Sequence, residues 1–213
     1  MIYISGSATL WPPSRPPFRP LCARPAATMP YPALTTARLT LQPLGMEDAD
    51  AIQRVFPQWE IVRFLADQVP WPYPDNGASD YIERVALPAI RRGEQWHWTV
   101  RTLDAPGRLI GVISLMDHES HNNRGFWLAP DFHGRGYMTE ASDAVTAYWF
   151  EVLGKPLLRA PKAVANTGSR KISERSGMRV VGTEERGFVS GRQPAEIWEI
   201  TREEWLARRQ RHA

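Results

Sequence analysis

The sequence predicts an α+β fold, because segments with a period-two apolar pattern alternate along the chain with segments of helical spacing. Residues 38–44 alternate apolar and polar side chains, as a half-buried strand does, whereas residues 138–153 carry their apolar side chains on one helical face. A turn at residues 104–107 separates two apolar runs and predicts a hairpin, hence antiparallel pairing. With 213 residues, 43% of them hydrophobic and 23% charged, the chain fits one globular domain with a tail.

Composition excludes several classes of protein. No stretch approaches the ~20 apolar residues of a membrane helix, so we expect no membrane partner. The single cysteine, Cys22, excludes an internal disulfide framework and a multi-cysteine zinc site. The five histidines lack metal-ligand spacing, so we expect no metal. The net charge of +3 comes from three arginines before residue 37, and the neutral remainder predicts no nucleic-acid partner.

Residues 1–33 differ in composition from the rest. Eight prolines lie between positions 12 and 32, a density that neither a helix nor a sheet interior tolerates. We therefore expect a disordered, polyproline-like tail at 1–33 and a folded domain at 34–209. The abrupt change of composition motivates a second hypothesis, that the natural protein starts at Met29 and that residues 1–28 come from a wrongly assigned start codon.

The first half of the domain predicts one strand and two helices. The strand is 38–44, and helical spacing over 48–56 ends at a proline. Residues 56–74 contain five aromatic residues and several prolines, so this segment should be irregular. An apolar stripe predicts a helix over 78–92, which Pro88 should kink or shorten.

The middle of the chain predicts a hairpin, a further strand and a long helix. Strands at 96–101 and 108–116 flank the turn, and the run Arg-Gly-Phe-Trp-Leu at 124–128 is the fourth strand of the domain. The helix over 138–153 stops at Gly154, a normal C-terminal cap.

The last part predicts three strands and two helices. A strand over 157–164 precedes a polar helix over 167–176, and strands near 180–184 and 196–201 flank a loop that contains glycine. Thr201-Arg202-Glu203-Glu204 has the spacing of a capping box and should start a short final helix.

The strongest site signal is the loop His133-Gly134-Arg135-Gly136-Tyr137-Met138, between a strand and a helix. Two glycines separated by one residue let backbone N–H groups converge, and a helix N-terminus adds free donors and a favourable dipole. Together they suit a pyrophosphate. The loop lacks the third glycine of a Rossmann motif and the Gly-Lys-Ser/Thr of a P-loop. Taken alone, such a loop is more often only a turn.

In its context the loop resembles the signature Arg/Gln-x-x-Gly-x-Gly/Ala of the GNAT superfamily of acetyl-CoA-dependent N-acetyltransferases. The likeness extends over residues 34–206 and is strongest to the branch of RimJ/RimL-like ribosomal-protein alanine N-acetyltransferases. The pieces that carry it are Asp131-Phe132-His133-Gly134-Arg135-Gly136, Thr36-Ala37-Arg38-Leu39-Thr40-Leu41, Pro70-Trp71-Pro72-Tyr73, Gly125-Phe126-Trp127-Leu128, Asn166-Thr167-Gly168-Ser169, Ser176-Gly177-Met178 and Thr201-Arg202-Glu203-Glu204-Trp205.

The resemblance implies a GNAT-like acyl-CoA N-acyltransferase fold. Its bent, mostly antiparallel sheet is splayed after the fourth strand and has helices on both faces. Acetyl-CoA, the co-substrate, would enter the split, with its pantetheine arm paired to the fourth strand like an extra strand. The residues that the resemblance places on acetyl-CoA are Trp127, Leu128, Ala129, His133, Gly134, Arg135, Gly136, Tyr137, Met138, Asn166, Ser169 and Arg170.

The chain departs from the family pattern at two positions. Asp131 stands where the signature has Arg or Gln, so this side chain cannot take the usual role near a pyrophosphate. Ser173 stands where many members have the tyrosine that protonates the departing CoA thiolate. A serine can donate a hydrogen bond to that thiolate but is a poor acid. For the general base, which accepts the proton of the amine, the candidates are His118 and Glu119, with His97 third.

The acceptor should bind beneath the aromatic segment and a hairpin loop at 184–195. Trp59, Trp71 and Tyr73 could contact it there, although we favour a core role for all three. We therefore predict a cytoplasmic N-acetyltransferase, monomer or homodimer, that acetylates a primary amine of a protein N-terminus or a small molecule. The alternative from another class is a catalytically silent acyl-CoA-binding or regulatory module.

Overall fold

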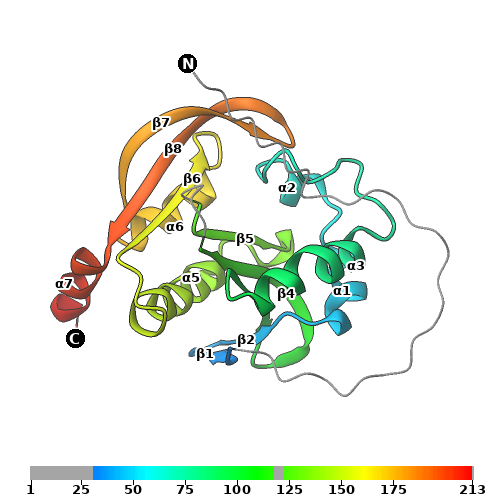
Figure 1. Ribbon diagram of the computed structural model, residues 1–213, viewed down its shortest axis with the longest axis horizontal. Helices are drawn as coiled ribbons and strands as arrows, with labels where there is room; N and C mark the ends of the chain where they lie inside the picture. Colours follow the sequence, from blue (N-terminus) through cyan, green and yellow to red (C-terminus); the bar gives the residue numbers. More distant parts are fainter. Residues whose placement is uncertain (1–30, 118–121, 213) are drawn as a thin grey trace.

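The computed structural model describes residues 31–117 and 122–212, and it contains two separate β-sheets (Figure 1). The larger is antiparallel with the order β1-β2-β3-β4-β5, and the smaller has the order β6-β8-β7. The expected tail up to residue 30, Cys22 and the candidate bases His118 and Glu119 lie outside the described residues. The strands are β1 Leu34–Thr35, β2 Leu39–Pro43, β3 Gln95–Thr102, β4 Ala105–Met116, β5 Arg124–Leu128, β6 Leu157–Ala163, β7 Arg179–Phe188 and β8 Gly191–Thr201.

Helices cover both faces of the larger sheet, as the α+β prediction requires (Figure 1). On one face, the helices before β3 pack on Leu109 and Val112 of β4. On the other, α5 packs on alternate side chains such as Trp98 of β3 and Ile113 of β4. The helices are η1 Met46–Asp48, α1 Ala49–Val55, α2 Trp59–Val62, α3 Gly77–Tyr81, η2 Ile82–Ala86, α4 Leu87–Arg91, η3 Pro130–Phe132, α5 Tyr137–Ala147, η4 Tyr148–Val152, α6 Thr167–Arg175 and α7 Arg202–His212.

The two sheets meet at one point and then separate. The amide of Asn123 donates to the carbonyl of Arg159 over 2.7 Å, and the amide of Arg159 donates to Oδ1 of Asn123 over 2.9 Å. Beyond this junction, and among the described residues, β5 pairs only with β4, and β6 pairs only with β8. This confirms the expected sheet that is splayed after the fourth predicted strand, and we call the opening between β5 and β6 the split.

The core begins earlier in the chain than the expected boundary at residue 34. The side chain of Tyr31 is 4% exposed, and its hydroxyl donates to the carbonyl of His97 over 2.5 Å. The indole nitrogen of Trp98 donates to the carbonyl of Pro32. The side chain of Tyr31 therefore packs on the sheet, and the backbone of Pro32 is hydrogen-bonded to it.

The predicted hairpin loop at 184–195 is wrong. β7 and β8 continue through this segment and leave only residues 189–190 as the turn, so that the hairpin forms a long arm (Figure 1). Most side chains of β7 are exposed on both faces. The segment therefore lacks the apolar alternation by which a strand is recognised.

Pro88 does not stop the predicted helix at its own position. The helix continues to Arg91, and a π-helical segment at η2, Ile82–Ala86, directly precedes α4. Pro88 is the second residue of α4, directly after this π-helical segment, so the change from α to π hydrogen bonding lies beside the residue that lacks an N–H. Within residues 31–117 and 122–212, no helix is both long and apolar enough to cross a membrane.

Candidate acetyl-CoA and acceptor site

The edge of β5 that faces the split offers backbone groups from alternate residues. The amide of Ala129 donates to Ile110 of β4 over 2.8 Å, so this end of β5 is bonded to its neighbouring strand. Because successive residues of a strand point their backbone groups to opposite sides, those of Phe126 and Leu128 face the split. Nε2 of His133 lies 2.9 Å from the carbonyl oxygen of Leu128, which leaves the Leu128 amide as the open group there.

Two of the residues expected to pair with the pantetheine arm have backbone groups that are engaged within the protein. The carbonyl of Ala129 accepts from Phe132, so both backbone groups of Ala129 are already paired. Trp127 lies in register with Val112 of β4, and its carbonyl oxygen points at Gly111, where it would approach an added Cβ to 2.4 Å. The motif located β5 correctly but not which of its residues turn their backbone groups towards the split. It therefore did not single out Phe126.

The glycine loop has the geometry of an anion site. Gly134 and Gly136 have φ values of 75° and 79°, in the left-handed region that favours glycine, and Gly136 is the N-cap of α5. The first amides of α5, those of Tyr137 and Met138, have no partner inside the helix. The expected amide of His133 is not available, because it donates to Pro130 over 3.0 Å.

Arg38 of the first strand region braces this loop. Its Nη1 donates to the carbonyl of Arg135 over 3.0 Å, and its Nε donates to Glu140 in the first turn of α5 over 2.7 Å. Thr36 also donates to the Glu140 carboxylate. Burial alone would raise the pKa of Glu140, but these bonds hold it below its usual value. The loop thus keeps a fixed shape, and the nearby negative charge is compensated.

The remaining side chains of the loop flank the anion site. Met138 is buried in the core, while Tyr137 packs beneath the guanidinium of Arg38, which lies 4.7 Å from the ring centroid. The guanidinium of Arg135 lies 5.5 Å from the centroid of Phe132. Asp131 is exposed.

The expected residues of α6 are mostly engaged within the protein. Oδ1 of Asn166 accepts from the amide of Ser169 and caps α6, so its amide nitrogen is the group left for a ligand. The guanidinium of Arg170 binds both carboxylate oxygens of Glu196 on β8, over 2.7 and 2.8 Å. Ser173 is fully buried, and its hydroxyl has no hydrogen-bond partner within the described residues.

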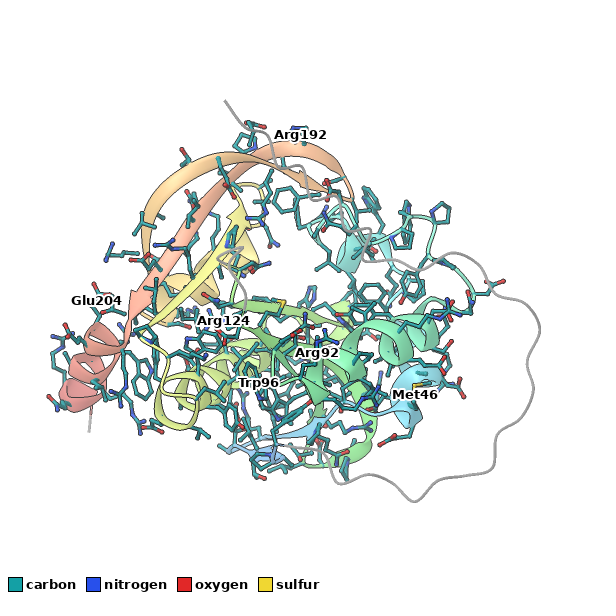
Figure 2. All side chains as sticks on the ribbon, in the orientation of Figure 1. Met46, Arg92, Trp96, Arg124, Arg192 and Glu204 are labelled. Atoms are coloured by element: carbon teal, nitrogen blue, oxygen red, sulfur yellow. The ribbon has the colours of Figure 1, made fainter. Side chains whose placement is uncertain are left out.

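Two buried cations near the split were not predicted. Arg124 of β5, fully buried, donates to Thr146 of α5 over 2.7 Å and lies where β5 and β6 meet (Figure 2). Lys162 of β6 is 7% exposed, and its Nζ lies 4.7 Å from the ring centroid of Phe126. Burial, with the charge of Arg124, lowers the pKa of Lys162 to about 7. No local sequence motif predicts a role for either residue, because each occupies a strand position at which the pattern leads one to expect a buried apolar side chain.

A cavity of about 170 Å³ lies beside β5, on the face of the larger sheet that the helices before β3 cover. His97 forms part of its wall, with Nδ1 2.7 Å from Ser114 Oγ, and burial lowers the pKa of His97 to about 4. The lining residues are Leu44, Ile52, Phe56, Leu65, Val69, Tyr73, Ala78, Tyr81, Ile82, His97, Val112, Ser114, Phe126 and Trp127.

The aromatic segment only partly forms a core. Tyr73 lines the cavity and packs edge-to-face on Phe56, with a centroid distance of 4.9 Å. Trp59 and Trp71 are 41% and 43% exposed and pack on each other, so the favoured core role is wrong for these two. In the part of the chain that the structure describes, no group of three histidine, cysteine or acidic residues could hold a metal ion.

Comparison with known proteins agrees with this geometry. Residues 38–179 match the family described as acetyltransferase (GNAT) domain. Among curated proteins, "Putative ribosomal N-acetyltransferase YdaF" of Bacillus subtilis is 35% identical over 89 residues, which are 40% of this chain and 49% of that protein. The match thus spans about half the length of that relative.

Solved structures share the fold. A RimL ribosomal L7/L12 α-N-protein acetyltransferase in complex with coenzyme A has a TM-score of 0.67 at 15% identity, covering 78% of this chain and 95% of that one. A spermidine N-acetyltransferase from Vibrio cholerae in complex with CoA and spermine also scores 0.67, at 21% identity, with 80% and 99% covered.

Proposed function

This chain belongs to the GNAT acetyltransferase domain family, and from that premise we propose that it transfers the acetyl group of acetyl-CoA to a primary amine. The observation that carries the proposal is the split, which opens beside the glycine loop. In this arrangement the free amides at the start of α5 bind the pyrophosphate. The pantetheine arm pairs with the open backbone groups of Phe126 and Leu128, as an added strand does.

The reaction needs little from the protein besides placement. A neutral amine attacks the thioester carbon, the carbonyl oxygen becomes negative, and an N–H on the open edge of β5 stabilises that charge. Holding the two substrates together supplies much of the remaining rate. His118 and Glu119 stay the candidate bases. His97 is a poor one, because its depressed pKa makes it a weak proton acceptor at neutral pH.

The cavity of about 170 Å³ beside β5, under the helices before β3, suggests which kind of amine binds. Its wall is mostly aromatic and aliphatic, and none of the described residues that line it is acidic. Such a wall suits an amine that carries an apolar group better than a polyamine, whose several charges would lose their hydration without a counter-charge. Our proposal thus favours an amine attached to an apolar body, acetylated in the cytoplasm by a monomer or homodimer.

Binding of the co-substrate is the first test. Acetyl-CoA or CoA at about 100 times its Kd adds about 2.7 kcal/mol to the free energy of unfolding, or about 5–10 °C in Tm for a domain of this size, whereas ATP should not. Gly136→Glu places a carboxylate at the anion site and should abolish the shift. Gly154→Glu is the matched control, because Gly154 also has a positive φ of 64° but lies at the end of the helix. An equal shift in both variants would remove the assignment of the glycine loop.

Turnover is the second test. We expect release of CoA from acetyl-CoA to be faster with phenylethylamine than with spermidine at equal concentration, because the cavity is apolar. A preference for spermidine would contradict the inferred acceptor. A CoA-induced shift without CoA release for any amine would support the silent acyl-CoA-binding module instead.

A further inference from the structure

Lys162 occupies the deep end of the split. Asn123 and Arg159 form the junction of the sheets. Phe126 of β5 and Lys162 of β6 each lie three residues beyond it, so Phe126 and Lys162 face each other across the split. The ammonium group reaches across the opening to within 4.7 Å of the Phe126 ring centroid. A ligand that pairs with the edge of β5 therefore ends beside this ammonium group.

The structure provides this cation with no counter-ion in the described parts of the chain. Glu196 of β8 is the cross-strand partner of Lys162, but Arg170 of α6 binds both of its carboxylate oxygens. The charged neighbour of Lys162 on β5 is Arg124, a second cation. The negative charge of Asp143 on α5 attracts Arg124 and favours its charged form. Arg124 thus has the Asp143 carboxylate, whereas Lys162 has no anion of its own among the described residues. Because a buried ammonium group without an anion is costly, an anion that a ligand brings into the split would be stabilised beside Lys162.

The direction of the ligand identifies that anion, and this step depends on the proposed function. With the pyrophosphate at the glycine loop, the arm runs back along Leu128 and Phe126, about 10 Å for the three residues from Ala129 to Phe126. Its sulfur end then lies deepest in the split. When the thioester breaks, the negative charge forms on that sulfur.

We propose that Lys162 is the acid that protonates the departing thiolate of CoA, and that Arg124 keeps the surroundings positive. The amine nitrogen forms a bond to the acetyl carbon, and the carbon–sulfur bond breaks with its electron pair on sulfur. An N–H bond of Lys162 then breaks as the S–H bond forms. The proton lost by the amine passes to the general base and from it to water, and Lys162 regains a proton from water after the products leave. Lys162 therefore takes the role expected of Ser173.

The direct test needs no acceptor, because it measures the thiol of bound CoA. The thiolate is followed by its ultraviolet absorbance during a pH titration of saturated enzyme, with the complex of desulfo-CoA as the blank. In the wild type we expect the pKa of the bound thiol to lie at least one unit lower than in Lys162→Met. Lys155→Met is the matched control, because Lys155 also lies over an aromatic ring, that of Trp149, outside the split. It should titrate like the wild type.

Equal thiol pKa values in the wild type and in Lys162→Met, with CoA bound to both, would overturn the inference and leave the proposed function standing. No CoA binding to the wild type would overturn both. If Lys162→Met does not fold, a measurement on the wild type alone tests the inference. The ratio of the affinity for CoA to the affinity for desulfo-CoA should grow as pH rises. In turnover, Lys162→Met should lose about 10²-fold in kcat with little change in KM for acetyl-CoA.

Discussion

At the scale of single residues, His97 shows how a buried group links the sheet to solution pH. The side chain is 2% exposed, and its two ring nitrogens lie 2.7 Å from Ser114 Oγ and 2.8 Å from Gln95 Oε1. Burial lowers the pKa of His97 to about 4, so the folded protein keeps this imidazole neutral at pH values where the unfolded chain protonates it. Acid therefore favours unfolding through this residue.

The sign and size of this effect can be measured. The stabilisation by neutral His97 is complete above the unfolded pKa near 6.5 and is lost as pH falls towards 4, an effect of about 3 kcal/mol. His97→Gln keeps polar atoms but does not titrate. Urea unfolding at pH 7 and pH 4 should therefore show a loss of stability smaller by about 3 kcal/mol in the variant than in the wild type. An identical loss in both proteins would mean that His97 is not kept neutral by the fold.

At the scale of elements, a sequence pattern located those strands that bury one face. β2 and β5 lie within one residue of their predicted bounds, because one-sided burial imposes alternation on the side chains. The arm of β7 and β8 was cut short in the prediction, since solvent on both faces imposes none. The glycine loop was recognisable because its conformational requirement is local.

Other parts of the site depend on contacts between distant residues, and these were not predictable from the pattern. Arg38 braces a helix that begins about a hundred positions later, where it meets Glu140. Lys162 reads as one more position of a strand until its neighbours across the split are known. The bulge in β4 opposite Val100 and Arg101 is likewise a product of pairing, not of local sequence.

At the scale of the whole molecule, the start of the fold gives a prediction about the tail. A chain that begins at Met29 retains Tyr31, so its Tm and its CoA-induced shift should equal those of the 213-residue chain. Tyr31→Ala in either chain removes a buried aromatic ring that packs on Trp98 with a centroid distance of 4.9 Å. We expect it to cost about 3–5 kcal/mol.

Thermal unfolding checks this prediction. The tyrosine variant should melt at least about 6 °C lower, and the shortened chain should not. A shortened chain that melts several degrees lower than the full one would show that residues 1–28 belong to the folded domain.

The split has a further consequence, for how the protein avoids sticking to itself. Strand edges with open N–H and C=O groups usually invite pairing with another chain, and proteins guard against it with charges, prolines or covering loops. Here the open edge of β5 faces β6, and their junction at Asn123 and Arg159 holds the two strands together at one end. A strand from a second molecule would have to enter a wedge that is closed at its apex. The open N–H and C=O groups of β5 can thus bind a narrow ligand, while another protein strand is kept from pairing with them and starting aggregation.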